Sequence, residues 1–102
     1  MTQFPQHLMI VRARVEPGVE ADWNRWYDDK HLPEILACPG FEQAARFVSE
    51  VDGEREYIAV YTLSDEQAMS GEMFNERRGW EQFAPNVTAE VRQFRMVSER
   101  QS

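Results

Sequence analysis

Cysteine and long hydrophobic runs are what this 102-residue sequence most lacks. It has one cysteine, Cys38, so no disulfide can form within the chain. No apolar stretch approaches the ~20 residues that a membrane-spanning helix needs. The first residues do not show the basic segment followed by an apolar segment that is typical of a signal peptide. We therefore expect a soluble, cytoplasmic protein that does not associate with membranes.

Positive charge is also scarce. The chain carries 11 Lys and Arg against 18 Asp and Glu, which gives a net charge of −7 and a pI of about 4.8. A surface this acidic repels phosphate backbones and anionic lipid headgroups. The charge therefore argues against a nucleic-acid or membrane partner and is expected to serve solubility.

The usual motifs of metal and cofactor sites are missing as well. The sequence contains no HxH, HExxH or CxxC pattern, and its two histidines lie far apart. It has no glycine-rich loop of the dinucleotide or P-loop type, and no GxSxG. The sequence therefore predicts no metal site and no cofactor.

What is present predicts one α+β domain over residues 1–102. The composition is 42% hydrophobic and 28% charged, which is typical of a globular chain. Four stretches have strand character and two have helical character. The strands are His7 to Val15, Phe41 to Val51, Glu56 to Leu63 and Val87 to Val97, and the helical regions are Val19 to Cys38 and Asp65 to Phe83. This βαββαβ order predicts a ferredoxin-like fold, in which both helices cover one face of a four-stranded antiparallel sheet.

Local signals refine these bounds. Asp52-Gly53 predicts a hairpin turn. Pro33 predicts a kink or a fresh helical start in the first helical region. Ser64 and Gln67 have the spacing of a capping box for the second region, and Gly71 is a point where that region could break.

The third strand indicates that the open face of the sheet is also covered. Tyr57, Tyr61 and their neighbours at alternate positions share one face, whereas Ile58 and Val60 lie on the other. Both faces are therefore partly apolar, although a sheet with one wet face shows a cleaner alternation. A second copy of the same sheet is the simplest cover, which predicts a homodimer.

One segment of the first helical region could carry chemistry. Trp23, Tyr27 and His31 have i, i+4, i+8 spacing and therefore share a helix face. A histidine among aromatic side chains could serve as a general acid or base near neutral pH, with Glu34 orienting its ring. The alternative is a histidine with a purely structural role.

Arg46 and Tyr61 are further candidates on the strands. Arg46 lies among small and apolar residues, so it could clamp a substrate carboxylate or simply be an edge arginine with a packed stem. Tyr57 and Tyr61 could donate hydrogen bonds to a substrate or serve as core aromatics. Three tryptophans are candidates for the wall of an apolar pocket: Trp23, Trp26 and Trp80.

A run of motifs in the first half of the chain resembles the EthD-like branch of the dimeric α+β barrel superfamily. It comprises Val15-Glu16-Pro17-Gly18-Val19-Glu20, Trp26-Tyr27-Asp28-Asp29-Lys30-His31-Leu32-Pro33, Pro39-Gly40-Phe41 and Ala45-Arg46-Phe47. The resemblance implies two ferredoxin-like sheets that pack face to face in a homodimer, with a ligand cleft between sheet and helices. His31 and Arg46 match the histidine and arginine of the family pattern. Members of the superfamily include cofactor-free monooxygenases, isomerases, cyclases and haem-binding enzymes.

Together these features predict a small cofactor-independent enzyme that acts on an aromatic, lactone or polyketide-like molecule by proton transfer. His31 would be the general acid or base, Tyr27 or Tyr61 a hydrogen-bond donor to a developing oxyanion, and Arg46 the anchor for substrate charge. The alternatives are a non-catalytic binding protein, a cofactor-free monooxygenase, and a haem protein with His31 as the axial ligand.

Overall fold

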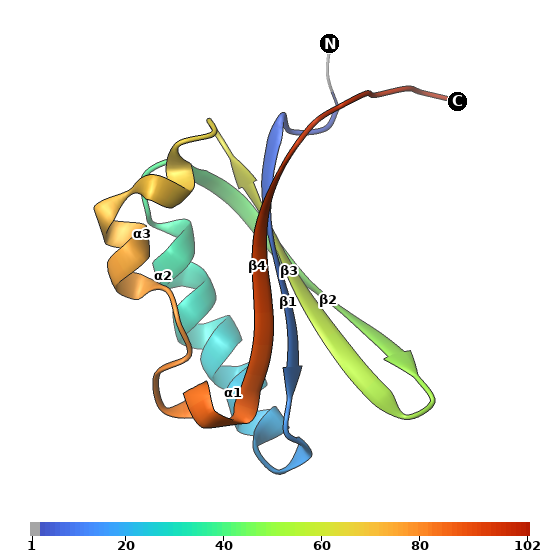
Figure 1. Ribbon diagram of the computed structural model, residues 1–102, viewed down its shortest axis with the longest axis vertical. Helices are drawn as coiled ribbons and strands as arrows, with labels where there is room; N and C mark the ends of the chain where they lie inside the picture. Colours follow the sequence, from blue (N-terminus) through green and yellow to red (C-terminus); the bar gives the residue numbers. More distant parts are fainter. Residues whose placement is uncertain (1–2) are drawn as a thin grey trace.

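Four antiparallel strands form one sheet in the computed structural model, which describes residues 3–102 (Figure 1). The strands are β1 (His7–Val15), β2 (Phe41–Val51), β3 (Glu54–Leu63) and β4 (Val87–Arg95). Their spatial order is β2-β3-β1-β4, so the two central strands are β1 and β3. The predicted ferredoxin-like α+β fold is confirmed.

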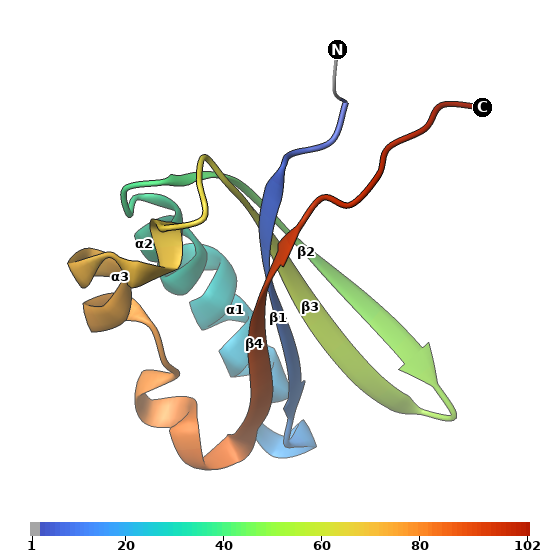
Figure 2. The same ribbon diagram turned by 45° about the horizontal axis from the view of Figure 1, so that its top comes forward.

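The helical elements all lie on one face of this sheet, as Figure 2 shows from a second direction. They are α1 (Glu20–Trp26), a π-helical turn (Tyr27–His31), α2 (Leu32–Leu36), α3 (Glu72–Arg77) and three 3₁₀ segments (Pro17–Val19, Ala68–Ser70 and Glu81–Asn86). Among residues 3–102, no element covers the opposite face of the sheet.

The first helical region widens before Pro33. The backbone N–H of Leu32 donates to the carbonyl of Tyr27, five residues earlier, which is the hydrogen bond of a π-helix. Pro33 has no N–H to donate, but it is tolerated in the first turn of α2. The predicted fresh helical start near Pro33 is therefore confirmed. The π-turn places both of its end residues, Tyr27 and His31, in the protein interior.

The second helical region is shorter and more broken than predicted. The capping box at Ser64 and Gln67 is wrong, because the carboxylate of Asp65 accepts the Gln67 backbone N–H at 2.7 Å and forms a turn instead. An aspartate that bonds its own backbone competes with helix initiation. The break at Gly71 is confirmed, and a second break follows α3, where Gly79 adopts a φ of +112°.

Two turns depend on positive φ values. Asp52 and Gly53 have φ values of 54° and 81°, which confirms the two-residue hairpin between β2 and β3. Gly40, just before β2, has a φ of +90°, and a Cβ built on it would lie 2.7 Å from Ala68 Cβ. Gly40 therefore allows the backbone to pass close to the 3₁₀ segment Ala68–Ser70.

The core lies between the helices and the sheet. Its largest fully buried side chains are Trp23, Tyr27, Tyr61, Met9 and Ile35. Among the described residues, His31 is the one buried polar or charged residue, and it is 5% exposed. Burial in such a core disfavours the charged form of a titratable ring.

The open face of the sheet carries an apolar centre. Ile10 on β1 is opposite Val60 on β3, and the alternation of side chains turns both away from the helices. Two phenylalanines extend this apolar area: Phe47 on β2 is 55% exposed and Phe94 on β4 is 42% exposed. This agrees with the expectation from the sequence that both faces of the sheet are partly apolar.

Candidate functional site

A cavity of about 100 Å³ lies between the helices and the sheet. Its apolar walls come mainly from β1, α2 and α3, and its polar groups come from the π-turn, β3 and the segment after α3. The lining residues are Met9, Val11, Tyr27, His31, Ile35, Tyr61, Phe74, Arg78, Gly79, Trp80 and Val91. The structure thus brings together four residues that were predicted for the site: His31, Tyr27, Tyr61 and Trp80.

His31 is enclosed by aromatic rings. Its imidazole stacks on Trp26 at 4.7 Å between ring centroids with 15° between the planes, and it meets the edge of Tyr27 at 4.9 Å. Burial lowers the pKa of His31 from 6.5 to about 4; nearby Glu81 opposes this shift, and Arg46 reinforces it. Within the described residues the imidazole makes no hydrogen bond. At neutral pH it is therefore uncharged and able to accept a proton, but not to donate one as an imidazolium.

The Glu34 side chain is not what orients this ring. It is the Glu34 backbone carbonyl that takes part in contacts, accepting hydrogen bonds from Arg77 Nη1 at 2.9 Å and from Cys38 Sγ at 3.5 Å. The thiol of Cys38 is buried, and this burial raises its pKa. The thiol is therefore protonated at neutral pH, and it donates its hydrogen to the Glu34 carbonyl.

Tyr27 and Tyr61 form a buried pair of hydroxyls. Their oxygens are 3.0 Å apart, and either hydroxyl could be the donor. Burial raises the pKa of Tyr27, opposed by the Tyr61 hydrogen bond, and burial together with the neighbouring Tyr27 raises the pKa of Tyr61. Both remain protonated at neutral pH. Because the mutual bond uses only one O–H, the other is free to donate toward the cavity.

Arg46 lies behind Tyr27 and does not line the cavity. Its guanidinium carbon is 4.3 Å from the Tyr27 ring centroid, and its side chain is 11% exposed. It donates to Asp28 Oδ1 at 2.8 Å and to Asn24 Oδ1 at 2.7 Å. Both partners belong to the chain, so the structure gives this arginine an internal role in holding the π-turn and α1 against β2.

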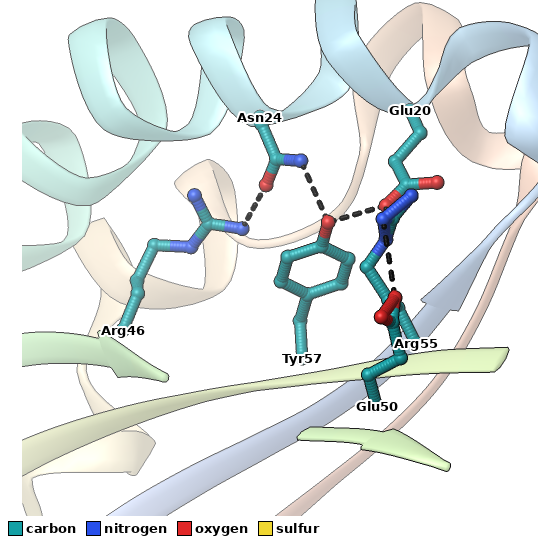
Figure 3. Close-up of polar contacts among 6 residues, drawn as sticks. All are labelled: Glu20, Asn24, Arg46, Glu50, Arg55 and Tyr57. Carbon is teal, nitrogen blue, oxygen red and sulfur yellow. Dashed lines mark hydrogen bonds and ion pairs between the residues drawn. The ribbon is translucent and has the colours of Figure 1, made fainter. Parts of the chain in front are cut away.

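Figure 3 shows how this arrangement continues along α1. Asn24 Nδ2 donates to the Tyr57 hydroxyl at 3.0 Å, and Tyr57 in turn donates a short hydrogen bond to Glu20. Arg55 pairs with both carboxylates: its Nε is 2.8 Å from Glu20 Oε2, and its Nη1 is 3.4 Å from Glu50 Oε1. No motif in the sequence predicted this network. Its signal is the i, i+4 spacing of the polar side chains of Glu20 and Asn24, which turns them toward the strands.

The tryptophans differ in their relation to the cavity. Trp80 lines it, whereas Trp23 and Trp26 form a second layer behind the lining. Trp23 is fully buried and packs on Tyr27 at 5.5 Å. Trp26 backs His31 and donates from Nε1 to Glu81 Oε2 at 2.7 Å.

Sequence reasoning missed Arg78 and Gly79, which also line the cavity. They lie in the short segment after α3 and are exposed, so the cavity reaches the surface beside them. The Arg78 guanidinium is 5.1 Å from the ring centroid of Phe74, another lining residue. The pattern Arg78-Gly79-Trp80 was the available signal, because a glycine between an arginine and a tryptophan permits a sharp turn that carries both side chains.

Within residues 3–102, no three His, Cys, Asp or Glu side chains are grouped so that they could hold a metal ion. In the same part of the chain, no helix has the length and apolar character needed to span a membrane.

The sheet and helices form a ferredoxin-like α+β fold with an aromatic cavity between them. Residues 6–96 match the family described as "Domain of unknown function (DUF4286)", and the chain belongs to that family. No curated protein matches the sequence.

Solved structures confirm the fold. A mutant form of SnoaB, a cofactor-independent oxygenase from Streptomyces nogalater, is 16% identical with a TM-score of 0.66, over 92% of this chain and 96% of that one. An ethyl tert-butyl ether d (EthD) family protein from Bacillus halodurans is 15% identical with a TM-score of 0.62, over 83% and 95%. A dimeric ferredoxin-like protein from an uncultured marine organism is 12% identical with a TM-score of 0.63, over 95% and 100%. An EthD family protein is thus among the proteins that share this fold.

Proposed function

We propose that the protein is a cofactor-independent enzyme that moves a proton on a small carbon acid bound in the cavity. The observation that carries this proposal is the uncharged His31, which lines the same cavity as the Tyr27–Tyr61 hydroxyl pair. A base and an adjacent hydrogen-bond donor are the two groups that enolisation needs.

In the proposed step, a ring nitrogen of His31 takes the proton from a carbon next to a substrate carbonyl. The electron pair of that C–H bond moves onto the carbonyl oxygen and forms an enolate. The free hydroxyl of the Tyr27–Tyr61 pair donates a hydrogen bond to this oxygen. Where a carbon–carbon double bond adjoins the deprotonated carbon, the imidazolium returns the proton to the far carbon of that double bond, which completes an isomerisation. In a cyclisation, the enolate carbon instead forms a bond to a second carbonyl carbon of the substrate, the π electrons of that carbonyl move onto its oxygen, and the imidazolium protonates this oxygen. Either route returns His31 to its uncharged form.

The size of the cavity restricts the substrate. It measures about 100 Å³, whereas pockets for drug-sized ligands measure roughly 300–1,000 Å³. A single aromatic ring or a lactone is therefore the favoured occupant. A polyketide-like substrate would have to project past Arg78 and Gly79 to the outside.

Hydrogen exchange tests this function without knowledge of the product. A panel of lactones and cyclic 1,3-diketones is incubated with the protein in D₂O, and NMR follows deuterium entering each carbon acid. We expect at least one compound to exchange faster with the protein, and His31→Gln to slow that exchange by about 10²–10⁴-fold. His7→Gln is the matched control, because the other histidine does not line the cavity. Equal exchange by His31→Gln and the wild type would sink the proposal.

A homodimer is part of the same proposal. The open sheet face with Ile10, Phe47 and Val60 is apolar, and a solved protein with this fold is described as dimeric. We expect Val60→Glu to convert the dimer to a monomer, measured by light scattering, because it would bury a carboxylate between two sheets. Val97→Glu makes the same change at an exposed position outside the sheet and should leave the dimer intact.

A cofactor-free oxygenase is the second candidate, because SnoaB is an oxygenase with this fold and an electron-rich indole, Trp80, lines the cavity here. Oxygen uptake with hydroquinone-like substrates tests it. If compounds raise the melting temperature but cause neither exchange nor oxygen uptake, the chain is a binding protein.

A further inference from the structure

The cavity lining has an unusual charge for this protein. The chain carries 18 acidic and 11 basic residues, yet none of the lining residues is acidic. Arg78 is the one lining residue with a permanent charge, because His31 and the two tyrosines are uncharged at neutral pH. The cavity is therefore locally positive in an acidic molecule.

Arg78 is also free of ion pairs within the described residues. Two other cations close to the site are neutralised: Arg46 pairs with Asp28 at 2.8 Å and Lys30 pairs with Glu81 at 2.8 Å. The adjacent Arg77 does not line the cavity and donates to a backbone carbonyl. A guanidinium at a cavity mouth without a carboxylate partner retains its capacity for two parallel hydrogen bonds to an anion.

The segment that carries Arg78 is held at both ends. Arg77 Nη1 donates to the Glu34 carbonyl at 2.9 Å on one side, and Glu81 accepts from Lys30 and from Trp26 on the other. These contacts tie the segment to the helices that carry His31. The backbone that positions Arg78 is therefore fixed relative to the cavity before any ligand binds, which lowers the entropy cost of binding.

We propose that Arg78 binds an anionic group at the mouth of the cavity, so that the substrate is a small carboxylate whose ring or apolar part enters the cavity. The inference rests on the proposed function only in that both place the substrate in the same cavity. It would also help the chemistry, because an anion near His31 favours the protonated ring and makes the imidazole a stronger base.

Benzoate and benzamide test this inference, because they have one ring and nearly the same shape but differ in charge. Calorimetric titration of the wild-type protein should show that benzoate binds more tightly than benzamide. Arg78→Gln should weaken benzoate binding by about 10-fold or more, the range of a charge-assisted hydrogen bond, without changing benzamide binding. Arg78→Lys should restore part of the affinity.

The matched control is Arg100→Gln, which makes the same charge change at an exposed position outside the cavity lining. It should bind benzoate like the wild type, which separates a local contact from the net charge. The inference is overturned if the wild type does not prefer benzoate to benzamide, or if Arg78→Gln and Arg100→Gln bind benzoate equally well.

This experiment can fail separately from the test of the proposed function. Benzoate has no acidic C–H bond next to its carboxylate, so its binding needs no proton transfer, and His31→Gln should still bind it. Binding that depends on Arg78, without any exchange activity, would support the anion site and reject the enzyme. If Arg78→Gln keeps the exchange activity of the wild type and also binds benzoate as tightly as the wild type, the result would support the enzyme and reject the anion site.

Discussion

Lowering the pH tests the environment of His31 without any substrate. Burial lowers the pKa of this ring from 6.5 to about 4. The difference of about 2.5 pKa units, at about 1.4 kcal/mol each, makes folding less favourable by about 3 kcal/mol once the unfolded chain can take up the proton. This is a large part of the stability of a small domain.

The sign of the effect follows from where the proton binds. Between pH 6.5 and about 4 the unfolded chain protonates His31, whereas the folded chain does not. The free energy of unfolding therefore falls as the pH is lowered through this window. Above pH 6.5 neither state binds the proton, and below about pH 4 both states do, so the contribution of His31 is constant outside the window.

The measurement is urea unfolding followed by tryptophan fluorescence, at a fixed protein concentration because a dimer would couple stability to concentration. His31→Phe keeps an aromatic ring on Trp26 but cannot titrate. All other groups titrate in both proteins, so the difference between the two curves isolates His31. We expect this difference to change by about 3 kcal/mol across the window. Parallel curves for the two proteins would refute a buried, uncharged imidazole.

Three further predictions concern stability. Tyr61→Phe should cost about 1–3 kcal/mol in the free energy of unfolding, since it leaves the buried Tyr27 hydroxyl without its partner, and the double change to phenylalanine should cost less than the sum of the single changes. Gly40→Ala should cost about 2 kcal/mol or more because of its positive φ and the close contact with Ala68, whereas Gly18→Ala, with nothing within 4 Å, should stay within about 0.5 kcal/mol. Arg46→Lys should cost about 1–2 kcal/mol, because an ammonium cannot hold both of its present partners in the same geometry, and it should leave benzoate affinity unchanged.

Urea unfolding measures all three. Additive costs for the two tyrosine changes would mean that the hydroxyls do not interact. Equal stability of the two glycine variants would contradict the close approach at Gly40. A loss of benzoate affinity in Arg46→Lys at unchanged stability would return this arginine to the role of substrate anchor that the sequence suggested.

Local sequence signals determined the framework of the fold. Asp52-Gly53 placed the hairpin because few residue pairs tolerate two positive φ values in succession. Pro33 marked the start of α2 because it has no N–H to continue the preceding helix. Such signals depend only on neighbouring residues, so they can be read without the rest of the molecule.

Where local signals competed, the sequence was misleading. Ser64 and Gln67 had the spacing of a capping box, but Asp65 between them formed its own turn. Both arrangements satisfy backbone donors locally. Just beyond this turn, Ala68 packs closely against Gly40, which is remote in sequence.

The candidate site shows the same division. The i, i+4 spacing of Tyr27 and His31 indicated one shared helix face, and the sequence thereby predicted two residues that line the cavity together. Only the tertiary structure showed that Tyr61 meets Tyr27 from the sheet, that Arg46 is occupied by internal partners, and that Arg78 stands at the cavity mouth. Residue type and spacing determine what a side chain can do, but its pKa, its partners and its access to a cavity depend on which distant residues surround it, and that is decided by the folded chain.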